Sequence, residues 1–190
     1  YYNNIEYNTF ATTGNTTDFG DLTEATQIAP GFSSPTRGIR STGNGLVGGS
    51  SFTSSTMDYV TIASTGNAID FGDNTSTRYN AGGCASSTRG LTAGGNSGDP
   101  NYTNLATIDY VTIASTGNAV NFGNLAGMSG LYVRGLSSET RGTFFAQGNV
   151  ICVVTIASTG NAVDFGDLTG GTGSGNQWLS GTSNCHGGLA

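Results

Sequence analysis

The sequence contains no lysine: all six basic residues are arginine, against twelve acidic residues and a net charge of −6. Nucleic-acid binding needs clustered positive charge, so this composition argues against a nucleic-acid partner. No apolar run is long enough to cross a bilayer, which argues against a membrane partner. Charged residues make up only 9% of the chain, a fraction atypical of a charge-driven disordered protein, so we expect a folded domain.

Side chains typical of catalytic or metal sites are also scarce. The lone histidine, His186, offers one titratable base, but the spacing pairs no nucleophile with it. Cys84, Cys152 and Cys185 show no Cys-x-x-Cys spacing, and we interpret them as small buried side chains. A disulfide or a metal site at Cys185 and His186 is the alternative. We therefore expect no enzyme activity, no cofactor and no metal.

Glycine is abundant, at 32 of 190 residues, and it marks a repeat. The phrase TIASTGNA occupies residues 61–68 and returns at 112–119 and 155–162, with a degenerate copy, TFATTGNT, at 9–16. Its glycines, Gly14, Gly66, Gly117 and Gly160, are 52, 51 and 43 residues apart. Repeats of this period are typical of solenoids and propellers. We expect a single domain, residues 1–190, of four units at about 1–52, 53–104, 105–147 and 148–190.

Two further motifs recur after each phrase. The first is DFGD or a close variant, which supplies Asp18, Asp70 and Asp164, and the second is TRG, which supplies Arg37, Arg89 and Arg141. We interpret the aspartates as turn or ion-pair residues, with a calcium site as the alternative. We expect the arginines to tie neighbouring units to the repeated aspartates, with an anion site as the alternative.

The repeated phrase joins and overlaps two segments of alternating hydrophobicity, DYVTIAS and AIDFGD, and this alternation indicates two strands. Gly and Asn tolerate the positive φ of tight hairpin turns, so the Thr-Gly-Asn segment is predicted to be the turn between them. A phosphate-binding loop would open a helix, and no helical period follows. Each unit then contains about four short strands, the size of one propeller blade. The fold class is therefore expected to be all-β.

The order of strands, Gly94-Gly95, spacer and hairpin resembles the kelch motif, with Tyr59 where a kelch tyrosine would fall. The consensus of the repeats, DYVTIASTGNAVDFGDL followed by SSTRG and AGG, resembles kelch-like repeat proteins of marine phages, cyanophages especially. The resemblance implies a small β-propeller of four kelch-like blades and a virion or tail-associated protein. It departs from kelch in lacking the usual tryptophan and a clean double glycine in the other units.

In the kelch frame the chain begins with the hairpin half of a blade, residues 7–22, and ends with the other half, residues 178–190. We expect these halves to form one composite blade that closes the ring, with an open array completed by neighbouring chains as the alternative. Residues that break the repeat are candidates for surface contacts: Tyr79, Tyr102, Tyr132 and Trp178.

Taken together, these features favour a non-enzymatic structural or interaction module of a phage particle. Its expected partners are other virion proteins or copies of itself, with a host surface glycan as a further candidate. The alternative is a secreted microbial carbohydrate-binding or adhesin propeller, which would place the protein outside the cell rather than in a virion.

Overall fold

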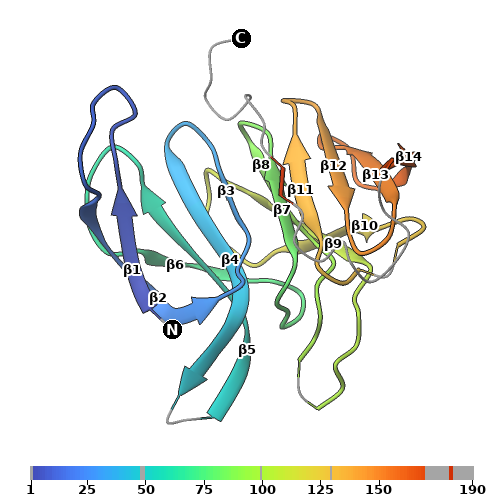
Figure 1. Cartoon of the computed structure of the whole chain (residues 1–190), viewed down its shortest axis with the longest axis horizontal. Helices are drawn as coiled ribbons and strands as arrows, with labels where there is room; N and C mark the ends of the chain where they lie inside the picture. Colours follow the sequence, from blue (N-terminus) through green and yellow to red (C-terminus); the bar gives the residue numbers. More distant parts are fainter. Residues whose placement is uncertain (1, 48–49, 99, 129, 170–179, 182–190) are drawn as a thin grey trace.

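The computed structural model describes residues 2–47, 50–98, 100–128, 130–169 and 180–181, and every regular element within these ranges is a β-strand. The strands form three antiparallel sheets (Figure 1). The all-β class expected from the alternating segments is confirmed. No helix among the described residues is long and apolar enough to cross a membrane.

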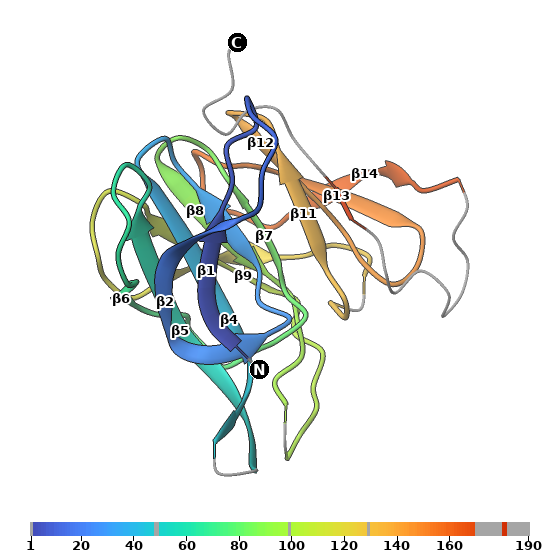
Figure 2. The ribbon, with the colours of Figure 1, turned by 60° about the vertical axis from the view of Figure 1, so that its left-hand side comes forward.

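The first sheet has the order β1-β2-β4-β5-β6, with β3 paired to β4. Its strands are β1 (Tyr2–Tyr7), β2 (Thr17–Gln27), β3 (Gly31–Ser33), β4 (Arg37–Val47), β5 (Ser50–Thr61) and β6 (Ile69–Asp73). The N-terminal hairpin β1–β2 joins this sheet through only two residue pairs between β2 and β4, and β2 follows a strongly bent path (Figure 2).

The second and third sheets are four-stranded meanders of the same design. The second contains β7 (Gly82–Ala85), β8 (Arg89–Ala93), β9 (Thr107–Thr112) and β10 (Val120–Asn124). The third contains β11 (Arg134–Ser137), β12 (Arg141–Phe145), β13 (Val150–Thr155) and β14 (Val163–Asp167). Each of these two sheets takes its first two strands from one sequence unit and its last two from the next. The sheets are therefore offset from the unit boundaries expected from the sequence.

The hydrophobic core lies between neighbouring sheets rather than within one. One cluster joins Phe32, Ile39, Met57 and Phe71 of the first sheet to Val111 and Ile113 of the second. The other joins the second sheet to the third, around Leu91, Phe122, Phe144 and Ile156. Because each sheet buries its apolar face only against its neighbour, the repeats stabilise one another as in other repeat proteins.

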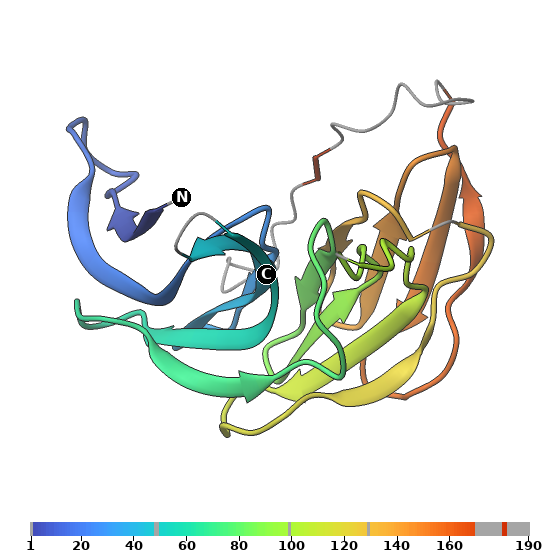
Figure 3. The same ribbon diagram turned by 90° about the horizontal axis from the view of Figure 1, so that it is seen from below.

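The sheets follow one another along an open arc, with the N-terminal hairpin at one end and β14 at the other (Figure 3). A closed four-bladed ring is not established by this arrangement. The composite blade was expected to need residues 178–190, and all of these except 180–181 lie outside the described residues.

Candidate functional site

The DFGD motif forms a β-bulge at the edge of each sheet. Between β5 and β6 the pairing register shifts from Met57↔Gly72 to Asp58↔Asp70, which leaves Phe71 without a partner in the ladder. The same shift occurs where β10, β14 and β2 pair with their neighbours. A bulge leaves its extra residue unpaired, so the phenylalanine carbonyl is free to bond outside the sheet.

The repeated Gly-Asn segment of the next unit bonds to this bulge. The Gly66 amide donates to the Phe19 carbonyl at 2.7 Å, and the Ala68 amide donates to the Asp21 carbonyl at 2.8 Å. The Asn67 Oδ1 accepts from the Asp21 amide at 3.0 Å. We call this set of three hydrogen bonds the clasp. It explains why glycine and asparagine recur together in the phrase.

Two further clasps repeat the same geometry along the chain. The corresponding bonds are Gly117 to Phe71 at 2.7 Å, Ala119 to Asp73 at 2.8 Å, Asp73 to Asn118 at 3.0 Å, Gly160 to Phe122 at 2.8 Å, Ala162 to Asn124 at 2.8 Å and Asn124 to Asn161 at 3.0 Å. The clasped glycines have φ of 153° to 158°. The three clasps connect all the consecutive units from the N-terminal hairpin to the third sheet.

The expected role of the phrase as a tight turn is wrong. The chain reverses earlier, where the Ser64 amide donates to the Thr61 carbonyl at 3.2 Å, and the Gly-Asn segment then runs extended along the preceding unit. The positive φ expected for Gly66, Gly117 and Gly160 is present, but it serves the clasp rather than a turn. Gly14, in the degenerate copy, is not among the glycines with positive φ.

The repeated arginines tie neighbouring units together, but through carbonyls rather than through aspartates. Arg37 Nη1 donates to the Ile113 carbonyl at 2.9 Å, and Arg89 Nη1 donates to the Ile156 carbonyl at 3.1 Å. Each guanidinium also stacks on a ring of its own sheet: Arg37 on Tyr59 at 4.4 Å, Arg89 on Tyr110 at 4.8 Å and Arg141 on Phe165 at 5.5 Å. Arg37, Arg89 and Arg141 thus each lie over a ring of a different sheet, and the two that also bond to carbonyls use the next sheet along the chain.

The repeated aspartates act locally. Asp70 Oδ1 accepts from the Gly72 amide at 3.1 Å, and Asp164 Oδ1 accepts from the Gly166 amide at 2.9 Å, so both stabilise the bulge of their own strand. Asp18 is exposed at the equivalent place in the first unit. Within the described residues, no three His, Cys, Asp or Glu side chains gather where a metal ion could be held.

Two buried ion pairs were not anticipated from the sequence. Arg40 pairs with Asp58, and Arg78 Nη2 donates to Asp109 at 2.7 Å, with both side chains of the second pair fully buried. Burial lowers the pKa of Arg78, whereas Asp109 opposes that shift. Asp58 and Asp109 occupy the same position of the repeated DYVTIAS segment, and this recurrence was the available signal. Each carboxylate also accepts from a threonine amide of the preceding unit, Thr23 at 3.3 Å and Thr75 at 3.2 Å.

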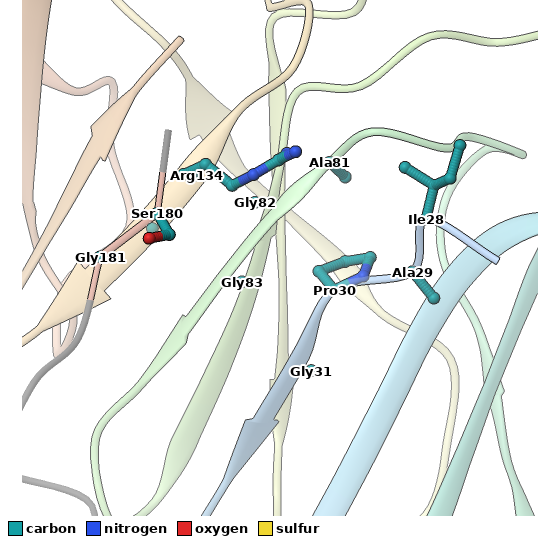
Figure 4. Close-up of a pocket in the computed structure, with 11 residues that line it drawn as sticks. Ile28, Ala29, Pro30, Gly31, Ala81, Gly82, Gly83, Arg134, Ser180 and Gly181 are labelled. Carbon is teal, nitrogen blue, oxygen red and sulfur yellow. The ribbon is translucent and has the colours of Figure 1, made fainter. Parts of the chain in front are cut away.

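One strand from each sheet, β3, β7 and β11, approaches its neighbour closely, and residues in and beside these strands line a pocket of about 330 Å³ (Figure 4). The approach requires small residues, because a Cβ on Gly83 would lie 3.0 Å from the Gly31 carbonyl and one on Gly135 would lie 2.7 Å from the Gly83 carbonyl. These glycines recur at intervals of 52 residues, a signal that the sequence analysis did not use. We call this the inner pocket.

One charged side chain, that of Arg134, lines the inner pocket and extends toward Ala81 of the neighbouring strand (Figure 4). Its Nη1 donates to the Val133 carbonyl at 2.8 Å. Partial burial lowers the pKa of the guanidinium. Among the described residues, the rest of the wall is glycine, alanine, proline, Ile28 and Ser180, so the guanidinium and one hydroxyl are the polar side-chain groups that line the pocket.

Strained backbone marks the entrance of each of these strands. Ile28, Asn80 and Tyr132 stand at equivalent positions and have φ of 57°, 59° and 55°, in the left-handed region that costs an L-residue about 1–2 kcal/mol. Hydrogen bonds between strands hold them: the Asn80 amide donates to the Ile28 carbonyl at 3.3 Å, and the Val133 amide donates to the Asn80 carbonyl at 3.0 Å. Such strain concentrates at functional sites and ligand clamps.

Three of the four expected surface-contact residues lie near one another beside this entrance. Burial raises the pKa of Tyr79, and Tyr102 and Tyr132 raise it further, which places all three phenols within electrostatic reach. The 96–104 insert positions Tyr102: Asn96 Nδ2 donates to the Tyr102 carbonyl at 2.9 Å, and the Tyr79 amide donates to the Asn96 carbonyl at 3.0 Å. We call these side chains the tyrosine cluster. The fourth expected residue, Trp178, lies outside the described residues, as does His186.

Two cysteines are buried free thiols. Burial raises the pKa of Cys84 to about 12 and also raises that of Cys152, so both remain protonated and unreactive at neutral pH. Cys185 lies outside the described residues. A comparison with models of known families found no match, and neither did a comparison with curated proteins.

Proposed function

We propose that this protein is a non-enzymatic interaction module, built as an array of kelch-like propeller blades, which serves a phage particle as a decoration, fibre or tail-associated component. The observation that carries the proposal is the clasp. Most polar groups that the sequence repeats are engaged in joining one unit to the next, through the clasps, the arginine ties and the buried ion pairs. A chain that uses its polar residues in this way presents surface rather than turning over a substrate.

The proposal of a phage protein is supported by the amino-acid sequence of the repeats, which resembles that of kelch-like proteins of marine phages. The same resemblance supports a fourth, composite blade made from an N-terminal hairpin and C-terminal strands, which belong either to one chain or to neighbouring copies. In this proposal the protein resides in the virion, and its partners are other virion proteins or further copies of itself.

Quantitative mass spectrometry of purified particles whose genome encodes the chain tests this function. We expect the protein in a fixed ratio to the major structural proteins, and a His186→Arg variant, which restores the arginine of the repeat, should be incorporated equally well. Absence of the protein from intact particles, or a chemical reaction that the His186→Arg variant loses while keeping its fold, would contradict the proposal.

The tyrosine cluster favours a second candidate, binding of a surface glycan. The exposed Tyr102 and the half-buried Tyr79 and Tyr132, together with Arg134 of the inner pocket, offer aromatic surface and hydrogen-bond donors, the combination that orients polar ligands. A glycan array probed with the wild type and a Tyr102→Ala variant distinguishes the two functions. Loss of glycan binding with unchanged incorporation would assign the tyrosine cluster to recognition and the clasps to assembly.

A further inference from the structure

The third sheet ends in an acceptor half of the clasp that no described residue occupies. Phe165 stands where Phe71 and Phe122 stand in the preceding bulges, yet its side chain is 54% exposed, against 2% and 3% for those two. A Cβ added to Gly72 or Gly123 would lie 2.5 or 2.2 Å from the carbonyl of the incoming glycine, whereas one added to Gly166 meets nothing within 4 Å.

This acceptor half already has the conformation of the occupied ones. Gly166 has a φ of 141°, within the range of 134° to 156° shown by its equivalents Gly20, Gly72 and Gly123. Arg141 also lacks the tie made by Arg37 and Arg89, since its guanidinium stacks on Phe165 and donates to no carbonyl of the described residues. The β14 bulge, the Phe165 ring and the Arg141 guanidinium are therefore contacted by no following unit among the described residues.

The first unit carries the matching donor half, also unoccupied. Residues 9–16 repeat the phrase and keep its turn, with the Thr12 amide donating to the Thr9 carbonyl at 3.2 Å. Phe10 stands where Ile62, Ile113 and Ile156 stand and is 100% exposed, against 47%, 1% and 1% for those residues. Gly14 and Asn15 are exposed, and Gly14 lacks the positive φ of the three clasped glycines.

The two halves belong to one chain but lie at opposite ends of the arc (Figures 1 and 3). The hairpin that carries the donor half is hydrogen-bonded into the first sheet through β2 and β4, which fixes it away from β14. The three internal clasps show what fits the acceptor half, and the only unused copy of that phrase among the described residues is at residues 9–16.

We propose that the acceptor half on β14 binds residues 9–16 of a second copy of this chain, head to tail. The Gly14 and Thr16 amides would donate to the Phe165 and Asp167 carbonyls, Asn15 Oδ1 would accept from the Asp167 amide, and Arg141 would reach the Phe10 carbonyl. Such a contact is heterologous, so it propagates into a ring of copies or a filament. The inference names the self-association surface of the proposed interaction module but does not depend on its residing in a virion.

Two variants, each blocking one half, test the inference. Gly166→Ala places a methyl group where the incoming carbonyl must lie, and Gly14→Val disfavours the positive φ of a clasped glycine. A Cβ added at either position meets no other atom within 4 Å in the free chain. Gly148→Ala is the matched control, because Gly148 also has positive φ, 118°, and open space around it, but lies in the β12–β13 connection.

Sedimentation velocity gives the readout. For the wild type and the control we expect a mass that rises above 19.2 kDa with concentration, and for each blocked variant a constant 19.2 kDa. An equimolar mixture of the two blocked variants should double that mass and stop there, because one open half remains on each. Circular dichroism and thermal melting of the dilute variants confirm that both are folded.

Several outcomes would overturn the inference. At a concentration of about 0.5 mM, even a dissociation constant as weak as about 1 mM would raise the average mass measurably. A wild type that stays at 19.2 kDa up to that concentration would therefore show that the proposed contact does not form. A monomer whose Gly14 amide is nevertheless protected from hydrogen exchange would show that the ring closes within one chain. If the equimolar mixture of Gly166→Ala and Gly14→Val stays monomeric, the two halves do not bind each other head to tail. Incorporation into particles is measured separately, so either idea can fail without the other.

Discussion

One buried position of the repeat holds an aspartate in two units, Asp58 and Asp109, and an uncharged cysteine, Cys152, in the next. Arg40 lies opposite Asp58 across β4 and β5, whereas Phe144 lies opposite Cys152 across β12 and β13. The third sheet therefore carries neither charge at this pair of positions, and in the second sheet Thr92 lies opposite Asp109 while Arg78 supplies the cation. This is the expected pattern, because replacing a buried ion pair by apolar residues is tolerated, whereas removing one partner leaves an uncompensated charge.

Replacing one partner alone should therefore be costly. We expect Arg78→Met to lower the free energy of unfolding by about 3–5 kcal/mol, because Asp109 would stay buried without its cation. Urea unfolding followed by circular dichroism measures this. The comparison variant, Arg37→Met, removes a partly exposed arginine from a tyrosine ring and from the Ile113 carbonyl, and it should cost less, about 1–2 kcal/mol. Equal losses for the two variants would contradict a special role for the buried pair.

The buried Cys84 thiol should make stability depend on alkaline pH. Burial raises its pKa in the folded chain to about 12, above its ordinary value of 9.0. The folded chain thus keeps a proton that the unfolded chain releases, so this contribution is fully present below pH 9.0 and is lost as the pH rises toward about 12. Urea unfolding across that window measures the decline. The Cys84→Ala variant should show a shallower decline, and an identical slope would contradict the assignment.

The clasp joins each connection between strands to the preceding unit. Its contribution to the free energy of unfolding can be separated from the cost of backbone strain by comparing two glycines. Gly72 and Gly166 have nearly the same φ, 134° and 141°, but only Gly72 faces an incoming carbonyl, at 2.5 Å from an added Cβ. We expect Gly72→Ala to cost about 1–3 kcal/mol more than Gly166→Ala, the usual cost of overpacking. Thermal melting of dilute samples, in which chains remain monomeric, compares them. Similar melting temperatures would mean that the second unit can release the clasp without loss.

The alternation of β-branched residues was sufficient to predict strands in the repeated segments, because a hydrophobic period of two indicates a β-strand where no helical period of 3.6 is present. The clasp was not predictable in the same way. A Gly-Asn pair fits a tight turn and an extended crossing equally well, and the choice here depends on a bulge 46 residues earlier in the chain, at Asp21. The same holds for Arg78, whose aspartate lies 31 residues away on another strand.

At the scale of the whole molecule, the three sheets form a series, and among the described residues only the middle sheet contributes to both hydrophobic clusters. The second sheet contributes Val111 and Ile113 to the cluster shared with the first sheet, and Leu91 and Ile108 to the cluster shared with the third. In such a series each unit depends on its neighbours, so stability should decrease from the middle sheet toward the ends.

Hydrogen exchange measures this gradient directly. In a dilute sample we expect the slowest amides in β8 and β9, whose residues are mostly buried, and the fastest in β1 and β14, which are mostly exposed. Among the repeated glycines, the Gly66, Gly117 and Gly160 amides should be protected, because each donates in a clasp, whereas the Gly14 amide should exchange freely. Raising the protein concentration should then slow exchange at Gly14, and leave β8 unchanged. Uniform protection of all four glycines in the dilute sample would mean that the arc is already closed within a single chain, and the repeats would then form a ring without free ends.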